Sequence, residues 1–207
     1  MDALFNSPWS IKQDVKNNTQ LLIADLFLGS LKKIIVGNKH VSTIYTDSSY
    51  RLSSLLQDPS TGNIYVTFHH GLGLIDYESL SFSVIAGSSS HAGFVDGALS
   101  QIRFNYPRDV VFLCPRKLLI ADLHNRRLRV LDLITNTSSS ICSGVTGHLD
   151  GDLSSCQLNL PWSFLTVNDV IFVGENRYIL SIQGNYHCTS AGFTKYYKCC
   201  HSDPVFS

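Results

Sequence analysis

The chain has 207 residues, of which 44% are hydrophobic and 15% charged, and this composition excludes a disordered chain, which needs low hydrophobicity and high charge. Sixteen basic residues balance sixteen acidic ones, so the net charge does not favour general binding to nucleic acid or to an acidic membrane. No apolar run approaches the roughly 20 residues of a membrane-spanning helix, and the first residues do not have the pattern of a signal peptide.

The first predicted unit covers about residues 1–50 and contains a short apolar hexapeptide, Leu21–Leu26. It also opens on an apolar-Asn-x-Pro motif that begins at Phe5, so close to the start that we expect the chain to be part of a longer protein. A continuously apolar strand is typical of a strand that is buried on both faces. Asp25 ends it, and we expect its carboxylate to accept backbone N–H groups from the following turn.

The second predicted unit covers about residues 51–103, with an apolar strand at Ile64–Thr67. Near its end, Asp96-Gly97 is a turn signal, because glycine supplies a positive φ without steric cost. His69 and His70 are the one adjacent histidine pair. Neighbours on a strand point to opposite faces, so we expect these two rings not to share a metal ion.

The third predicted unit covers about residues 104–157 and repeats the hexapeptide identically at Leu118–Leu123, 97 residues after its first copy. That separation is twice a period near 48 residues. Within the unit, four short strands are separated by turn-rich segments: 109–113, 118–121, 128–133 and 139–142. No segment has the length and periodicity of a helix between them, which excludes an α/β arrangement.

The fourth predicted unit covers about residues 158–182 and carries the apolar-Asn-x-Pro motif again, ending at Pro161. The turn Asp150-Gly151 precedes it, as Asp96-Gly97 precedes the third unit. Residues 183–207 form a cysteine-rich tail, which we expect to supply a last strand, within 192–197, or to begin a further module.

Four short antiparallel strands per unit of about 50 residues are typical of a β-propeller blade, whose apolar faces only neighbouring blades can cover. The sequence therefore predicts an all-β fold, an incomplete or open propeller of about four blades.

The third unit also resembles the NHL-repeat propellers, through Phe104-x-x-Pro107, the Leu119–Asp122 strand and the Asn125-Arg126-Arg127-Leu128-Arg129 segment. The first unit is a degenerate match, and the second and fourth hold only parts of the pattern. Such propellers usually close with six blades, so the resemblance implies missing blades or adjoining domains in a longer parent protein. The expected structural residues of the repeat are Pro8, Asp25, Asp96, Gly97, Pro107, Asp122, Asn125, Arg127, Arg129, Asp150, Gly151 and Pro161.

The six cysteines fit no zinc-binding or redox spacing. Cys142 ends the third unit and Cys156 precedes the fourth, so a disulfide between them would hold this linker against its sheet. Two free buried thiols are the alternative. The cysteines, together with glycosylation sequons at Asn17 and Asn136, favour an extracellular or secreted parent protein, although this chain shows no signal peptide.

No residues are predicted to be catalytic, to bind a cofactor or to bind a metal, because no nucleophile, base or ligand cluster converges in the pattern. The predicted function is a non-catalytic scaffold that binds a protein or glycan partner through its blade loops, and this step rests on fold analogy. Two alternatives remain open. One is an RNA-binding propeller, and the other is a metal-dependent, lyase-like propeller enzyme. The basic residues weighed for RNA binding are Arg116, Lys117, Arg126, Arg127 and Arg129.

Overall fold

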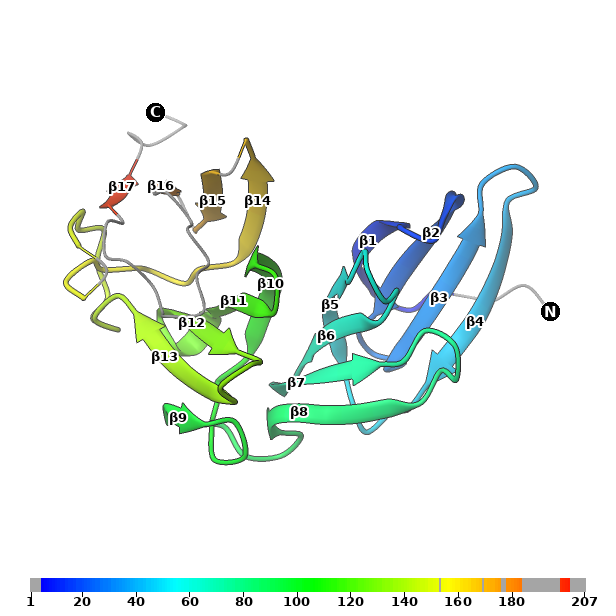
Figure 1. Cartoon of the computed structure of the whole chain (residues 1–207), viewed down its shortest axis with the longest axis horizontal. Coiled ribbons are helices and arrows are strands. Elements are labelled where there is room, and N and C mark those ends of the chain that lie inside the picture. The colour runs from blue at the N-terminus through cyan, green and yellow to red at the C-terminus, as the bar shows by residue number, and fades with distance from the viewer. Residues whose placement is uncertain (1–4, 153, 169, 176–177, 184–197, 202–207) are drawn as a thin grey trace.

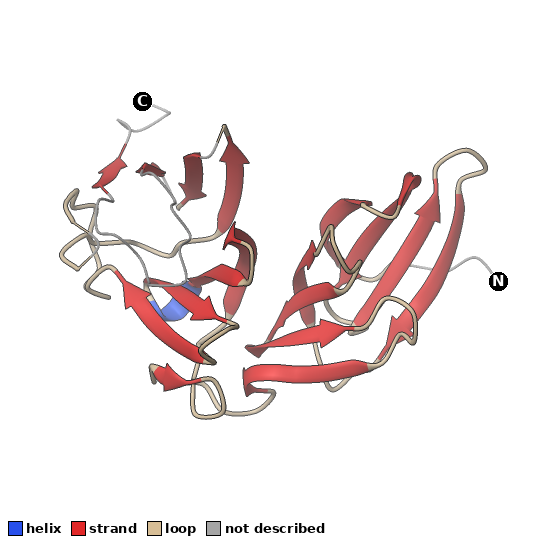
Figure 2. Cartoon of the chain, in the orientation of Figure 1, coloured by secondary structure: helices blue, strands red, loops and turns tan. Residues whose placement is uncertain are grey.

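A computed structural model describes residues 5–152, 154–168, 170–175, 178–183 and 198–201. The chain folds into four antiparallel sheets, and the one helical segment of the described residues is a single 3-10 turn, η1 (Leu123–Asn125) (Figure 2). The first sheet contains β1 (Pro8–Asp14), β2 (Asn17–Asp25), β3 (Ser30–Ile35) and β4 (His40–Thr46). The second contains β5 (Leu52–Gln57), β6 (Ile64–Phe68), β7 (His70–Ile75) and β8 (Phe82–Ser88). The third contains β9 (Gly97–Ala98), β10 (Pro107–Cys114), β11 (Lys117–Asp122), β12 (Arg127–Asp132) and β13 (Thr137–Ile141). The fourth contains β14 (Ser163–Val167), β15 (Val170–Gly174), β16 (Ile179–Gln183) and β17 (Lys198–His201).

The sheets are the blades of an open propeller, which confirms the predicted fold class. They follow one another along an arc, with β1 to β4 at one end and β14 to β17 at the other (Figure 1). Contacts between neighbouring blades run through the innermost strands β1, β5, β10 and β14. We call the axis that these four strands surround the hub.

The two identical hexapeptides occupy equivalent positions, each in the second strand of its blade. Ile23 pairs with Lys32 of β3, and Ile120 pairs with Arg129 of β12 in the same register. Every residue of β11 is buried, and Leu118, Leu119 and Ile120 are completely inaccessible to solvent. The prediction of a strand that is dry on both faces is therefore confirmed for blade three.

The third blade has five strands rather than the four predicted. The extra strand is β9, whose Gly97 and Ala98 pair with Ser138 and Thr137 at the outer edge of the blade. The linker between blades two and three thus covers an edge that would otherwise leave unpaired backbone groups. In the fourth blade β17 pairs with β16. The strand predicted within 192–197 lies outside the described residues.

Apolar side chains from facing blades form the core. Between blades three and four, Leu119 and Val130 belong to one buried cluster with Phe164 and Val173. A buried carboxylate adds a polar link at the hub, since Asp109 of β10 accepts hydrogen bonds from Ser54 Oγ of β5 and from the backbone N of Phe164 in β14. Three blades are therefore joined through one side chain.

A disulfide joins Cys142 to Cys156, as the sequence predicted. It ties the end of β13 to the linker that enters blade four, and both residues are buried in the cluster between these blades. Cys114 is also disulfide-bonded.

Candidate functional site

The repeat residues singled out in the sequence build a buried polar network in blade three. Arg129 is fully buried and forms ion pairs with Asp122 at 2.8 Å and with Asp96 at 2.7 Å. Asn125 donates to the Asp122 carboxylate and to the Gly93 carbonyl, and Arg127 donates to the Cys142 carbonyl. The polar groups of these side chains are occupied by contacts within the fold, so they are not available to bind a ligand.

We expected the carboxylates of Asp25 and Asp122, which end the second strand of their blades, to accept backbone N–H groups from the following turn. The structure shows that they do not. Their backbone donors lie before the innermost strand instead. Asn6 and Ser7 donate to Asp25, and Asn105 donates to Asp122. The carboxylate of Glu175 accepts the backbone N–H of Asn159 in blade four in the same way. We call this contact, in which a backbone N–H before the innermost strand donates to a carboxylate after the second strand, the backbone latch. It explains why an apolar-Asn-x-Pro motif recurs in three blades.

The remaining predicted repeat residues lie in the segments that lead into the innermost strands. Pro8 and Pro107 begin β1 and β10, and Pro161 stands two residues before β14. Gly97 adopts a φ of 112°, which only glycine adopts readily. Asp150 and Gly151 lie in the corresponding linker before blade four.

A different set of residues points into the hub, and each follows directly after the position of the motif proline. In β1 and β10 the register slips just after the proline, so that Trp9 and Arg108 are bulged residues. Ser53 is bulged in β5, and Trp162 stands immediately before β14. A β-bulge re-aims a side chain, and here bulges turn Trp9, Ser53 and Arg108 toward the centre that Trp162 also faces.

Three of these residues meet. The ring centroids of Trp9 and Trp162 lie 6.1 Å apart with an interplanar angle of 28°. The Arg108 guanidinium carbon lies 4.1 Å from the Trp9 centroid and 4.7 Å from that of Trp162. Both indoles stay open to solvent, with exposed fractions of 40% and 46%. We call Trp9, Arg108 and Trp162 the hub cluster, which joins the first, third and fourth blades.

Arg108 has no acidic partner and no hydrogen bond among the described residues. Its Nε is buried and unpaired. Burial lowers the pKa of Arg108 from its ordinary value, a shift that Tyr106 opposes, but an arginine remains charged at neutral pH. The hub cluster therefore presents the positive charge of Arg108, whose N–H donors have no hydrogen-bond partner in the described part of the chain, between the aromatic surfaces of Trp9 and Trp162.

Three histidines surround Tyr106 beside this cluster. The Tyr106 centroid lies 4.6 Å from that of His70, 4.9 Å from that of His124 and 6.3 Å from that of His69. Our expectation that His69 and His70 point to opposite faces is wrong, because His69 lies in the turn between β6 and β7 and strand alternation does not apply. Their ring centroids are 5.9 Å apart. Among the described residues, no group of three His, Cys, Asp or Glu side chains is placed to hold a metal ion.

Burial and neighbouring cations keep these histidines neutral. Burial lowers the pKa of His69, and Arg51 lowers it further. Burial also lowers the pKa of His124, with a smaller contribution from Arg108 and Arg126. At neutral pH the local positive charge therefore comes from the arginines.

A cavity of about 70 Å³ opens between these groups. It is lined by Leu26, Arg51, Ser53, His69, Tyr106, Pro107 and Arg108. No carboxylate is among these lining residues, and two of them carry permanent positive charge. The cavity, which we call the hub cavity, is therefore suited to a small anionic group.

The basic residues weighed for RNA binding do not gather in one patch. Arg116 and Lys117 lie at the start of β11 and Arg126 beyond its end, and Lys117 pairs with Asp132 at 3.0 Å. Arg127 and Arg129 are held by the polar network of blade three.

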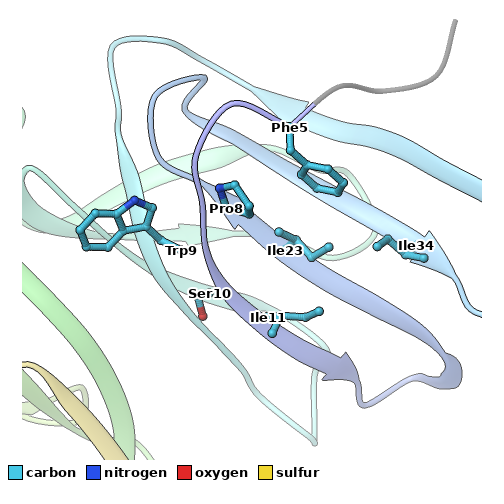
Figure 3. A pocket seen from close by; sticks show the side chains of 7 residues that line it. All are labelled: Phe5, Pro8, Trp9, Ser10, Ile11, Ile23 and Ile34. Atoms are coloured by element: carbon cyan, nitrogen blue, oxygen red, sulfur yellow. The ribbon is translucent and has the colours of Figure 1, made fainter. Parts of the chain in front are cut away.

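A larger hollow of about 300 Å³ lies on blade one, where Phe5, Ile11, Ile23 and Ile34 gather on one side while Trp9 points away from them (Figure 3). In blade three the residues of equivalent register are buried by blade two. They are Phe104, Val110, Ile120 and Leu131, all inaccessible to solvent. This hollow therefore lies on the face of blade one that corresponds to the face of blade three packed against blade two. A second hollow, of about 310 Å³, lies at the other end of the arc, around Leu165, Phe172 and Ile179 of blade four.

No helix in the described part of the chain has the length and hydrophobicity required to cross a membrane.

Comparison with known proteins establishes the fold. No protein-family model matches the chain. A curated protein, SUPPRESSOR OF QUENCHING 1, chloroplastic, from Arabidopsis thaliana, is 31% identical over 94 residues, which cover 42% of this chain and 9% of that protein. An auxiliary nutrient binding protein from Bacteroides thetaiotaomicron superimposes with a TM-score of 0.67 at 17% identity, over 80% of this chain and 44% of that one.

Two further solved structures support the same assignment. A Bacteroides thetaiotaomicron protein of unknown function gives a TM-score of 0.71 at 16% identity, over 81% of this chain and 44% of that one. A chain of a nidogen/laminin complex gives 0.63 at 11% identity, over 86% of this chain and 60% of that one. The chain thus spans less than two thirds of each of these proteins, and at such identities the likeness concerns the propeller fold alone.

Proposed function

We propose that this chain is a non-catalytic propeller scaffold that binds a protein or glycan partner at the hub, with Trp9, Arg108 and Trp162 as the principal contacts. The exposed indole pair around a cation without a hydrogen-bond partner carries this proposal. Tryptophan and arginine are among the residues most enriched at the binding hot spots of protein interfaces. Here they occupy one repeat position in three blades and converge, although the blade fold needs no large aromatic there, as Ser53 in blade two illustrates.

The proposal also includes NHL-type repeats, a longer parent protein and an oxidising compartment. The Asp122, Asn125 and Arg129 network supports the first, because it involves the residues that carry the resemblance. The apolar faces around Ile11 and Leu165 support the second, since the equivalent faces inside the arc pack against a blade. The Cys142–Cys156 bond supports the third.

The decisive experiment compares partner binding by the wild-type chain and by Trp9→Ala and Trp162→Ala variants on an array of defined glycans and peptides. Each substitution should weaken binding by at least about tenfold, the effect expected of a binding hot spot. Ile134→Ala is the control, since Ile134 is 61% exposed in the turn between β12 and β13. If all the variants bound the partner equally well, the binding site would not be at the hub. Chemical conversion of the bound ligand would contradict a non-catalytic role.

A further inference from the structure

The hub cluster and the hub cavity together define a class of ligand. We infer that the hub binds an acidic glycan through the carboxylate of a uronic acid residue, with Arg108 and Arg51 as the cations and the indoles of Trp9 and Trp162 as the platform for the sugar ring. This inference rests on the proposed function and specifies the ligand of that same site.

The charge of the cavity wall calls for an anion. Arg51 and Arg108 both line it, no carboxylate does, and the histidine on its wall, His69, has a lowered pKa and stays neutral. An arginine without a counter-ion in a partly desolvated site gains from any anionic group that approaches it. The N–H donors of a guanidinium form paired hydrogen bonds with a carboxylate, which are among the strongest in proteins.

Two buried donor or acceptor atoms at this site lack a hydrogen-bond partner. One is Arg108 Nε and the other is Nδ1 of His69. Buried polar atoms are normally paired, so unpaired ones call for a specific explanation. Stacking on an aromatic ring uses the flat face of a guanidinium and leaves its in-plane donors available. A ligand oxygen in the hub cavity would satisfy such donors.

The size of the cavity determines how much of the ligand enters. At about 70 Å³ it is far smaller than the clefts of about 300 to 1,000 Å³ that enclose whole small-molecule ligands. A carboxylate fits this space and a pyranose ring does not. The ring must then remain outside, where the exposed indoles of Trp9 and Trp162 offer flat, electron-rich faces to its C–H bonds. A uronic acid combines the two requirements in one residue.

The sequence provides a direct probe. It contains two tryptophans, and both belong to the hub cluster, so intrinsic tryptophan fluorescence reports on this site alone. The ligand for the test is a trimer of galacturonic acid, and the matched neutral ligand is the trimer of galactose. Each is titrated into the full chain at low and at high salt.

We expect a saturable fluorescence change with the acidic trimer, weakened by salt, and an affinity for the neutral trimer that is lower by about 10- to 100-fold, as expected when a charged hydrogen bond is lost. Arg108→Gln should reduce the affinity for the acidic trimer by a similar factor. Arg116→Gln, which removes an exposed arginine at the far end of β11, should change it by less than about twofold. Thermal unfolding of both variants checks that they fold, and the comparison of acidic with neutral trimer needs no variant.

Each contrary result has a defined meaning. Equal affinity for both trimers, or no response to the acidic one, overturns the acidic-glycan inference. Stronger binding of an acidic peptide or of inorganic phosphate overturns it as well, in favour of another anion. A neutral glycan or a protein whose binding depends on both tryptophans would overturn the inference and leave the proposed function standing. If no partner depends on either tryptophan, both fail.

Discussion

Blade three and blade one are built on the same hexapeptide, yet their polar interiors differ. At equivalent register, Arg129 in blade three stands opposite Ile120, and Lys32 in blade one stands opposite Ile23. Arg129 pairs with two carboxylates, whereas Lys32 donates to Thr43 and lies 5.7 Å from the centroid of Phe5. An identical strand therefore does not imply an identical network around it.

The other two blades extend the comparison. In blade two the positions of Asp122 and Arg129 hold Phe68 and Gly73, and Phe82 fills the space that a side chain at Gly73 would need. Phe68 and Phe82 form an aromatic cluster with Tyr50 in place of the polar network. In blade four, Leu180 stands where Arg129 does. The backbone latch onto a carboxylate is thus kept in three blades, and the buried arginine in one.

The largest expected difference between blades one and three concerns the covered face. Val110 is inaccessible to solvent and Ile11, at the equivalent position, is 57% exposed. Val110→Asp should destabilise the chain by more than about 4 kcal/mol, because it removes a buried apolar side chain and buries an unpaired carboxylate. Ile11→Asp should cost less than about 1 kcal/mol. Urea unfolding measures both, and equal losses would show that another part of the protein covers blade one.

Next in size is the buried arginine. Arg129→Met should cost about 3 to 5 kcal/mol, since it leaves the carboxylates of Asp122 and Asp96 without their cation. Lys32→Met removes a buried ammonium from a blade in which no carboxylate pairs with it in the described structure, and should change the free energy of unfolding by less than about 1 kcal/mol in either direction. A tolerated Arg129→Met would mean that the network of blade three adds little to stability.

Most of the fold could be predicted from the sequence because it depends on local and repeated signals. The spacing of Leu21–Leu26 and Leu118–Leu123 predicted the repeat, and their apolar run predicted a doubly covered strand. The fifth strand of blade three was missed, since Gly97-Ala98 reads as a turn and pairs only because the linker passes the edge of β13.

The hub cluster was missed for a physical reason. Trp9, Arg108 and Trp162 are far apart in the sequence, and bulges re-aim the first two, which alternation along a strand does not predict. One signal could have found them, since each follows the proline of the apolar-Asn-x-Pro motif. His69 and His70 were placed on opposite faces because the turn between β6 and β7 was not recognised. Which residues share a repeat position can be read from sequence, but which of them meet depends on the curvature of the arc.

A third difference is covalent. Blade three is tied to its neighbour by Cys142–Cys156, with a sequence separation of 14. Replacing both cysteines with alanine should cost about 3 kcal/mol, as expected for a closed loop of this length. Differential scanning calorimetry under oxidising conditions measures the loss. If reduction of the wild-type chain leaves its melting temperature unchanged, the bond contributes nothing to stability.

The smallest expected effect is a pH dependence that belongs to blade three. Burial alone would raise the pKa of Asp96, but hydrogen bonds from Ser140 and Ser138 and the charge of Arg129 hold it below its ordinary value. A lowered pKa in the folded state contributes stability above the unfolded pKa, and that contribution is lost as the pH falls through the folded value.

Asp96→Asn should therefore cost about 1 to 3 kcal/mol at neutral pH, the range for hydrogen bonds to a charged group, and the difference from wild type should shrink below about pH 4. Burial raises the pKa of Asp122 on the other side of Arg129, but Asp122 is present in both proteins, so its own titration largely cancels in the difference. Urea unfolding of the two proteins between pH 3 and pH 7 gives the curve. A difference that stays constant over this range would mean that the Asp96 carboxylate is not stabilised in its ionised form, and that the network of blade three depends on Asp122 alone.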